Sequence, residues 1–159
     1  MKKSVCIGLL LAGIATAAMA DMVTDREDLM KSFGGPGRIL GGMARMPDTF
    51  DAAAAKTQLQ ILSDGAAKIP TSFPAGSNDP ATKTLALPTV WSDNAGFMAA
   101  AAKFSGDIKS AQAATDGMTF QTAYGKVQGD CNACHMTYRA PLPPRAPAPP
   151  GAAPGAAAP

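Results

Sequence analysis

Between residues 21 and 140, apolar side chains recur every three or four positions, which is the spacing of one face of an α-helix. No segment shows the strict apolar and polar alternation, flanked by hairpin turns, that is typical of β-strands. Four helices are expected, joined by two short connections and one long one. The pattern therefore predicts an all-α domain that folds as an antiparallel four-helix bundle.

The first helix is predicted over residues 22–46. Its apolar face would contain Met22, Arg26, Leu29, Met30, Phe33, Leu40 and Met43. Pro36 interrupts it, because proline lacks an amide hydrogen and its ring clashes with the carbonyl four residues earlier. Two outcomes are open: the helix kinks at Pro36, or it stops and restarts with Pro36 in a new first turn.

The second helix is predicted to open at Asp48 or Thr49 and to run to about residue 68, with a core side of Phe50, Ala54, Leu59, Ile61 and Leu62. Four prolines between residues 70 and 88 predict a long irregular connection.

The third helix would begin at a cap formed by Ser92 or Asp93. It would bury Phe97, Ala101, Phe104, Ile108 and Ala111. A turn at residues 116–117 precedes the fourth helix, which is predicted from residue 119 to about 140.

The two ends of the chain have other compositions. Residues 1–20 combine a cationic start, an apolar stretch and a small-residue cleavage site, so they are interpreted as a signal peptide that is removed after export to the periplasm. Residues 141–159 are rich in Pro, Ala and Gly and are expected to be a disordered tail. The globular domain is thus predicted over residues 21–140.

The charge balance narrows the possible partners. Two of the 14 Lys and Arg residues lie in the leader, which leaves 12 against the 12 Asp and Glu residues. No basic stripe with interleaved aromatic residues remains, so nucleic acid is not an expected partner. No second long apolar run follows the leader, so stable membrane insertion is not expected either.

The candidate chemistry lies on the fourth helix. Cys6 leaves with the leader, and the two remaining cysteines, Cys131 and Cys134, stand directly before the only histidine, His135. The helical steps place one face of this helix at Phe120, Tyr124, Val127, Cys131, Cys134, His135 and Tyr138. Both thiols and the imidazole are therefore predicted to point into the bundle.

The spacing C-x-x-C-H is the attachment signature of haem c. Two thiols at this spacing add to the two vinyl groups of one porphyrin, and the adjacent histidine reaches the iron from the same side. A thiol–disulfide oxidoreductase would place the first cysteine at a helix N-terminus beside a strand. A zinc site needs about four donors, whereas only two cysteines and one histidine remain after the leader. Two cysteines on one helix are also poorly placed for a disulfide. Haem attachment is therefore favoured over these three alternatives.

With these residues assembled, the sequence resembles the class II c-type cytochromes, the cytochrome c′ family. The resemblance rests on residues 131–139, residues 26–31 of the first helix, and the segments that begin Phe73-Pro74 and Leu87-Pro88. It implies a periplasmic four-helix bundle with one covalent haem, often a homodimer through the first two helices. The implied activities are electron transfer with redox partner proteins or binding of a diatomic gas.

The resemblance also implies roles for individual residues. Met30 matches the position that faces the iron opposite His135, where methionine is the sixth ligand in one branch of the family and only a shield in the five-coordinate branch. A His/Met pair is a standard ligation for electron transfer, so a one-electron carrier is the favoured function. The alternative is a five-coordinate protein that binds NO or CO.

Four further residues are candidates for the haem pocket. Arg26 would pair with a haem propionate or remain solvated, and Arg139 would tune the iron electrostatically. Phe33 and Tyr138 would pack against the porphyrin or serve as general core residues. With one histidine and scattered acids, acid–base catalytic machinery is not expected, so the protein is not predicted to be an enzyme.

Overall fold

The computed structural model describes residues 21–78 and 83–142, so the predicted leader and almost all of the predicted tail lie outside the described residues. Residues 21–32 are helical. The long helices that follow are α2 (Gly34–Arg45), α3 (Ala52–Ala66), α6 (Asn94–Gln112) and α7 (Gly117–Tyr138). Three short helices, η1 (Pro47–Thr49), α4 (Ile69–Ser72) and α5 (Thr89–Ser92), lie in the connections.

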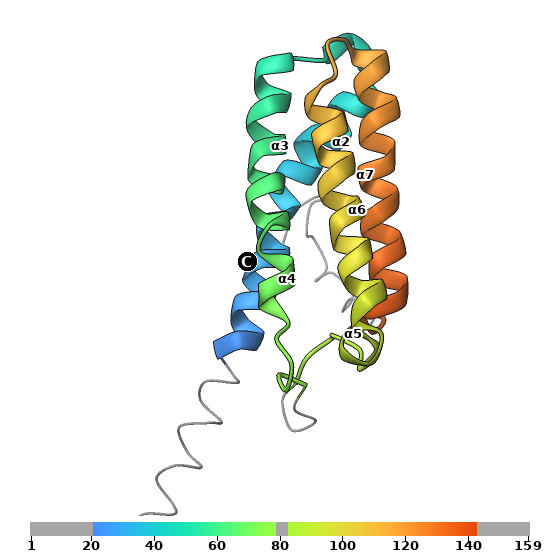
Figure 1. Ribbon diagram of the computed structural model, residues 1–159. Coiled ribbons are helices and arrows are strands. Elements are labelled where there is room, and N and C mark those ends of the chain that lie inside the picture. Colours follow the sequence, from blue (N-terminus) through green and yellow to red (C-terminus); the bar gives the residue numbers. More distant parts are fainter. Residues whose placement is uncertain (1–20, 79–82, 143–159) are drawn as a thin grey trace, which may run out of the picture.

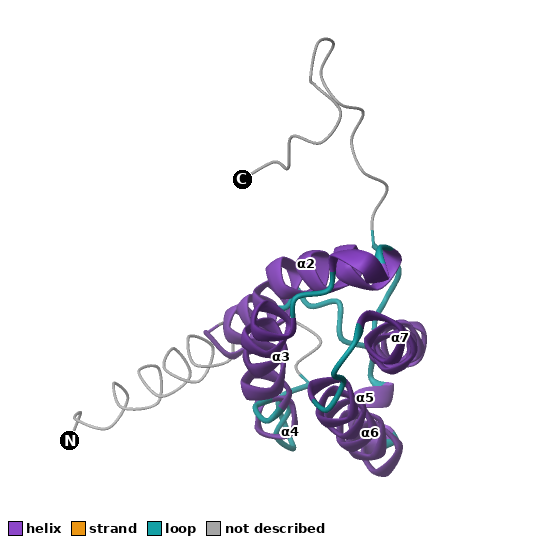
Figure 2. Cartoon of the chain, turned by 90° about the horizontal axis from the view of Figure 1, so that it is seen from above, coloured by secondary structure: helices purple, strands orange, loops and turns teal. Residues whose placement is uncertain are grey.

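The long helices alternate in direction, as the colours of Figure 1 show, and Figure 2 shows them grouped around a common axis. The α2–α3 and α6–α7 connections lie at one end of the bundle. The long α3–α6 connection lies at the other end, beside the C-terminal end of α7. The described residues contain no strand longer than a single bridge and no helix long and apolar enough to cross a membrane. The predicted antiparallel four-helix bundle is confirmed.

The core is apolar and is supplied by every long helix. Its most deeply buried large side chains are Leu40 of α2, Leu59 of α3, Val90 of α5, Ile108 of α6, and Phe120 and Val127 of α7. All five residues predicted as the buried side of the third helix are buried. In the second helix the prediction for Ile61 was wrong, because that side chain is 43% exposed.

The first predicted helix is divided at Phe33. Residues 21–32 are helical, Phe33 is a turn, and α2 begins at Gly34, so Pro36 lies in the first turn of α2. The helix therefore stops and restarts, which is the second of the two predicted outcomes. Proline is tolerated in a first turn because the amides there donate no intrahelical hydrogen bond that proline could remove. The Tyr124 hydroxyl donates to the Gly37 carbonyl at 3.2 Å and ties the restart to α7.

The helix caps are carboxylates. Asp51 caps α3 by accepting from the amides of Ala53 and Ala54, each at 2.9 Å. The predicted cap at Asp48 or Thr49 was wrong, because residues 47–49 form the separate 3₁₀ turn η1. Asp93 caps α6, which decides between the two predicted caps. Asp116 caps α7, which therefore starts two residues earlier than predicted.

The long connection is fastened to the first helix by Arg26, which is only 4% exposed. Its Nε donates to the Ser72 carbonyl at 2.6 Å, and an Nη donates to the Ser77 hydroxyl at 2.5 Å. The guanidinium also lies 4.8 Å from the Phe73 ring centroid and 5.5 Å from that of Trp91. Trp91 donates to the Pro74 carbonyl, so it also anchors the long connection.

Two glycines of α7 provide a matched test of the packing. A Cβ on Gly117 would overlap the backbone carbonyl of Pro47, whereas a Cβ on Gly125 would meet nothing within 4 Å. We expect Gly117→Ala to lower the free energy of unfolding by about 1–3 kcal/mol, because backbone atoms must move. Gly125→Ala should raise it by about 0.5–1 kcal/mol, because alanine favours the helix. Denaturant unfolding of both variants checks the signs, and two changes of the same sign would contradict this packing.

Arg26 should matter for stability far more than an exposed arginine. Removing its hydrogen bonds and its ring contacts in Arg26→Ala should cost about 2–4 kcal/mol. The exposed Arg38 of the neighbouring helix is the control, and Arg38→Ala should change stability by less than about 0.5 kcal/mol. Limited proteolysis should cut the long connection faster in Arg26→Ala only. Equal stabilities of the two variants would show that Arg26 does not fasten this connection.

Candidate functional site

The C-x-x-C-H motif lies in the last two turns of α7, and the long connection holds this end of the helix. The Tyr138 carbonyl accepts from the Leu87 amide at 2.9 Å, and the Thr137 carbonyl accepts from the Thr89 hydroxyl at 3.0 Å. The Ala140 amide donates to the Leu85 carbonyl at 2.7 Å. Carbonyls at a helix end have no intrahelical partner. The turns that carry the motif are therefore fixed rather than frayed.

The motif does not sit fully inside the bundle. Cys134 and His135 are half-buried, but Cys131 is exposed. Enough atoms nevertheless surround the Cys131 thiol that burial is the largest influence on its pKa, so the inward direction of both thiols stays a prediction. The buried face of α7 continues from Val127 through Asp130 to Tyr138, in steps that an α-helix of 3.6 residues per turn permits, and it leaves Cys131 beside this face.

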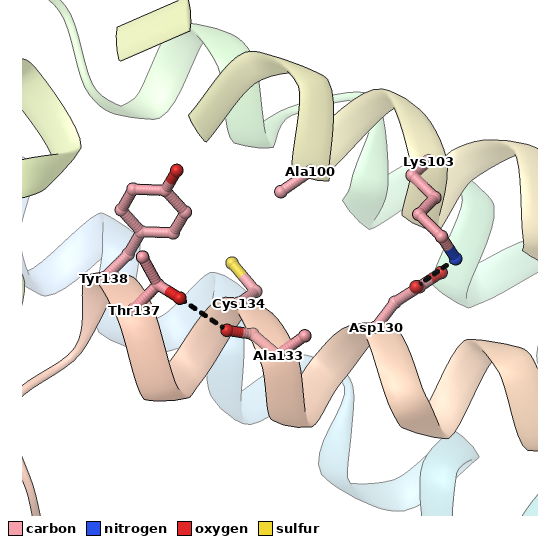
Figure 3. Close-up of a pocket in the computed structure, with 7 residues that line it drawn as sticks. All are labelled: Ala100, Lys103, Asp130, Ala133, Cys134, Thr137 and Tyr138. Atoms are coloured by element: carbon pink, nitrogen blue, oxygen red, sulfur yellow. Dashed lines mark hydrogen bonds and ion pairs between the residues drawn. The ribbon is translucent and has the colours of Figure 1, made fainter. Parts of the chain in front are cut away.

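Cys134 points into a groove between α6 and α7 (Figure 3). The groove has a volume of about 200 Å³ and is lined by Ala100, Lys103, Asp130, Ala133, Cys134, Thr137 and Tyr138. It is smaller than the ~300–1,000 Å³ of ordinary small-molecule pockets. The thiol is therefore accessible from this side without a large cavity in front of it.

The protonation states of the motif suit haem attachment. Burial raises the pKa of the Cys134 thiol, and the neighbouring Asp130 carboxylate raises it further, so the group is a neutral thiol at pH 7. The Cys131 pKa is raised by the same two influences and by Cys134. The two thiols are free and not joined in a disulfide.

His135 is also in the state that iron requires. Burial lowers its pKa, and the nearby Arg139 cation lowers it further, so the imidazole is neutral and has a free lone pair. Within the described residues, no group of three or more His, Cys, Asp and Glu side chains is placed to hold a metal ion. The donor set therefore fits a single imidazole ligand supported by a covalently held cofactor better than it fits zinc.

Two buried polar atoms near the motif have no hydrogen-bond partner among the described residues, the Oδ2 of Asp130 and the Nε of Arg139. Such atoms are rare in folded proteins because each costs about 1–3 kcal/mol. Arg139 follows His135 by one helical turn, where a cation is available to an acidic group of a cofactor. The residues present therefore fit a haem at this end of α7.

On the first helix, Met30 is half-buried and packs against the core. Phe33 lies between two other helices, with its ring 6.0 Å from that of Phe104 on α6 and over Gly65 on α3, where a Cβ would overlap the ring. Phe33 thus has a packing role in the bundle. Ligation by Met30 and a porphyrin contact of Phe33 both remain predictions.

Tyr138 and Arg26 are engaged by protein groups. The Tyr138 hydroxyl donates to Asp93 at 2.9 Å, and its ring lies edge-on to Phe97 at 5.3 Å. Arg26 is bonded to the long connection as described above, so its pairing with a propionate also remains a prediction. The sequence interpretation did not single out Asp130 and Lys103. The signal that was available is the position of Asp130 directly before Cys131 and one turn before Cys134.

Comparison with known proteins agrees with this picture. The family model described as Cytochrome C′ matches residues 21–139. A cytochrome c-556 of Agrobacterium fabrum is 37% identical over 134 residues, which are 83% of this chain and 88% of that protein. A cytochrome c′ of Rhodopseudomonas palustris is 31% identical over 84% of this chain and 92% of its own length.

A solved structure extends the likeness to three dimensions. The crystal structure of cytochrome c′ from Rubrivivax gelatinosus superimposes with a TM-score of 0.69 at 29% identity, and the match covers 76% of this chain and 96% of that one. The bundle, the family model and the relatives all agree. The chain is therefore a member of the cytochrome c′ family, the class II c-type cytochromes, and its cofactor is one covalently attached haem c.

Proposed function

We propose that this protein is a periplasmic one-electron carrier whose haem is attached through Cys131 and Cys134 and whose iron is ligated by His135 and Met30. The observation that carries the proposal is the motif at the fixed end of α7, with two free thiols and a neutral, half-buried imidazole. When bound, the haem iron supplies a reversible one-electron couple. The role is that of a carrier that exchanges electrons with redox partner proteins, not that of an enzyme.

Ligation by Met30 is supported by its surroundings. The side chain is half-buried on the helix of residues 21–32, which Arg26 ties to the long connection. Phe33, directly after this helix, packs against Phe104 and Gly65. A held thioether can bond iron without a large ordering cost. If His135 and Met30 both held the haem iron, it would change redox state with little rearrangement and would have no position left for a gas.

The alternative function is diatomic gas binding. It is favoured by the likeness to a protein named cytochrome c′, which stands beside the likeness to cytochrome c-556. In that case Met30 would only shield the face of the haem opposite His135, and NO or CO would bind there. Both functions use the same attachment residues and the same bundle.

A homodimer through the first two long helices is part of the proposal. Each of them exposes one large aliphatic side chain, with Ile39 on α2 at 47% exposure and Ile61 on α3 at 43%. Burying such residues against a second copy would be favourable by about 25 cal/mol for each Å² of apolar surface removed from water. Sedimentation of the purified protein measures the oligomeric state directly.

The attachment residues are tested by haem staining after denaturation. Wild type should retain haem, and the double variant Cys131→Ala/Cys134→Ala should lose all covalent stain, since no other cysteine follows the predicted leader. His135→Ala keeps both thiols, so it should keep the covalent haem stain. Its absorption spectrum should change, because the proposed iron ligand is gone. A wild-type protein without stain, purified from a host with haem c assembly, would overturn the proposed function.

The sixth ligand is tested with the volume-conserving variant Met30→Leu, which keeps the packing and removes only the sulfur. Wild type should show a low-spin spectrum that does not respond to CO, and Met30→Leu should become high-spin and bind CO. The control is Met118→Leu, a methionine of α7 that is 66% exposed, and it should resemble wild type. A high-spin wild type that binds CO would reject Met30 ligation and support the alternative function.

A further inference from the structure

A buried carboxylate lies beside the haem attachment residues. Asp130 is 9% exposed, directly precedes Cys131 and lines the same groove as Cys134, as Figure 3 shows. Its Oδ1 accepts from the Lys103 ammonium at 2.5 Å, and its Oδ2 is buried without a hydrogen-bond partner among the described residues. Ionising such a carboxyl group costs free energy, because the buried Oδ2 is removed from water and gains no hydrogen bond in return.

The Lys103 ammonium that contacts Asp130 is shared with a second carboxylate. Lys103 also contacts Asp107 of α6, with Nζ 2.7 Å from its Oδ2, so one ammonium serves two carboxylates. The lysine side chain is 63% exposed, which weakens its hold through solvent screening. The three residues therefore form a cluster with a net charge of −1 when both acids are ionised.

The two acids of the cluster titrate differently. Burial raises the pKa of Asp130, Lys103 opposes the shift, and Asp107 adds to it. For Asp107 the hydrogen bond from Lys103 lowers the pKa, and Lys126 of α7 contributes in the same direction. Among the described residues, the charged groups that act on Asp130 are thus Lys103 and Asp107, both from α6. Asp130 is the member of the cluster that takes a proton first as the pH falls.

We propose that Asp130 binds one proton when the haem accepts one electron, and that Lys103 and Asp107 set the pH at which this happens. The inference rests on the attachment of haem through Cys131 and Cys134. In the balanced step, one electron enters from a protein reductant or an electrode, one proton enters from solvent, and Asp130 becomes a neutral carboxylic acid. The groove between α6 and α7 gives solvent access to this carboxyl group.

The physical reason is the charge of the cofactor. The oxidised haem carries one more positive charge than the reduced haem, and a nearby positive charge favours the carboxylate. Reduction removes that charge, so Asp130 holds its proton more tightly in the reduced protein. By linkage, the midpoint potential must then fall as the pH rises through the Asp130 titration. Each tenfold difference in proton affinity between the two redox states corresponds to a potential change of ~59 mV.

The test is the midpoint potential of the haem-loaded protein as a function of pH. Wild type should show a fall in potential as the pH rises above 3.8, the ordinary aspartate value, and Asp130→Asn should remove it. Asp107→Asn is the matched control: it should keep the fall but move it to lower pH, because a neighbouring negative charge is gone. Lys103→Met should move it to higher pH. The reduced-minus-oxidised infrared spectrum should show a protonated carboxyl band that Asp130→Asn abolishes.

The outcomes separate this inference from the proposed function. Superimposable potential curves for wild type and Asp130→Asn, with covalent haem in both, would overturn the proton site and leave the carrier function intact. A wild-type protein without covalent haem would instead overturn the proposed function. If Asp130→Asn does not take up haem, Lys103→Met decides, and a potential curve unchanged from wild type would overturn the proposal.

Discussion

The fixed C-terminal end of α7 is the constraint on which the site depends. A helix end leaves several carbonyls without partners, and here the Thr137 and Tyr138 carbonyls are bonded by Thr89 and Leu87 of the long connection. The antiparallel topology brings that connection to the same end of the bundle as the motif. The three residues of the motif are thus presented by backbone that cannot fray, although α7 is close to the last of the described residues.

The same connection is in turn held by the first helix. Arg26 places a buried cation among the Ser72 carbonyl, the Ser77 hydroxyl and two aromatic rings. A buried guanidinium is tolerated because its donors are bonded and its faces contact aromatic π-systems. The segment that carries Met30 and the helix that carries His135 are therefore coupled through one loop. Movement of either helix along the bundle axis would break these bonds.

Buried polar groups are fully hydrogen-bonded in some parts of the molecule and not in others. Arg26 is bonded, whereas the two buried side-chain atoms that have no partner in the described part of the chain belong to Asp130 and Arg139. These residues lie one residue before Cys131 and four residues after His135. Apolar packing governs the opposite end, where Phe120 stacks between Phe50 and Tyr124. The buried polar groups without full hydrogen bonding thus lie next to the motif, where a change in the charge of a cofactor would change their electrostatic free energy most.

The sequence alone determined the helical class, the four-helix bundle and the identity of the cofactor. Periodicity reports which side chains leave water, and C-x-x-C-H is a local signature that requires no tertiary information. The sequence also predicted a cap at Ser92 or Asp93 and the five buried residues of the third helix, because caps and helix faces depend on neighbours within a few residues.

Only the tertiary structure decided the remaining features. The choice between a kink and a restart at Pro36 and the exposure of Ile61 depend on how helices meet, which no local pattern encodes. Asp130 shows this most clearly, because an aspartate on a helix is ordinarily solvated. It is buried here because α6 covers it, and Lys103 reaches it across 27 positions of the sequence.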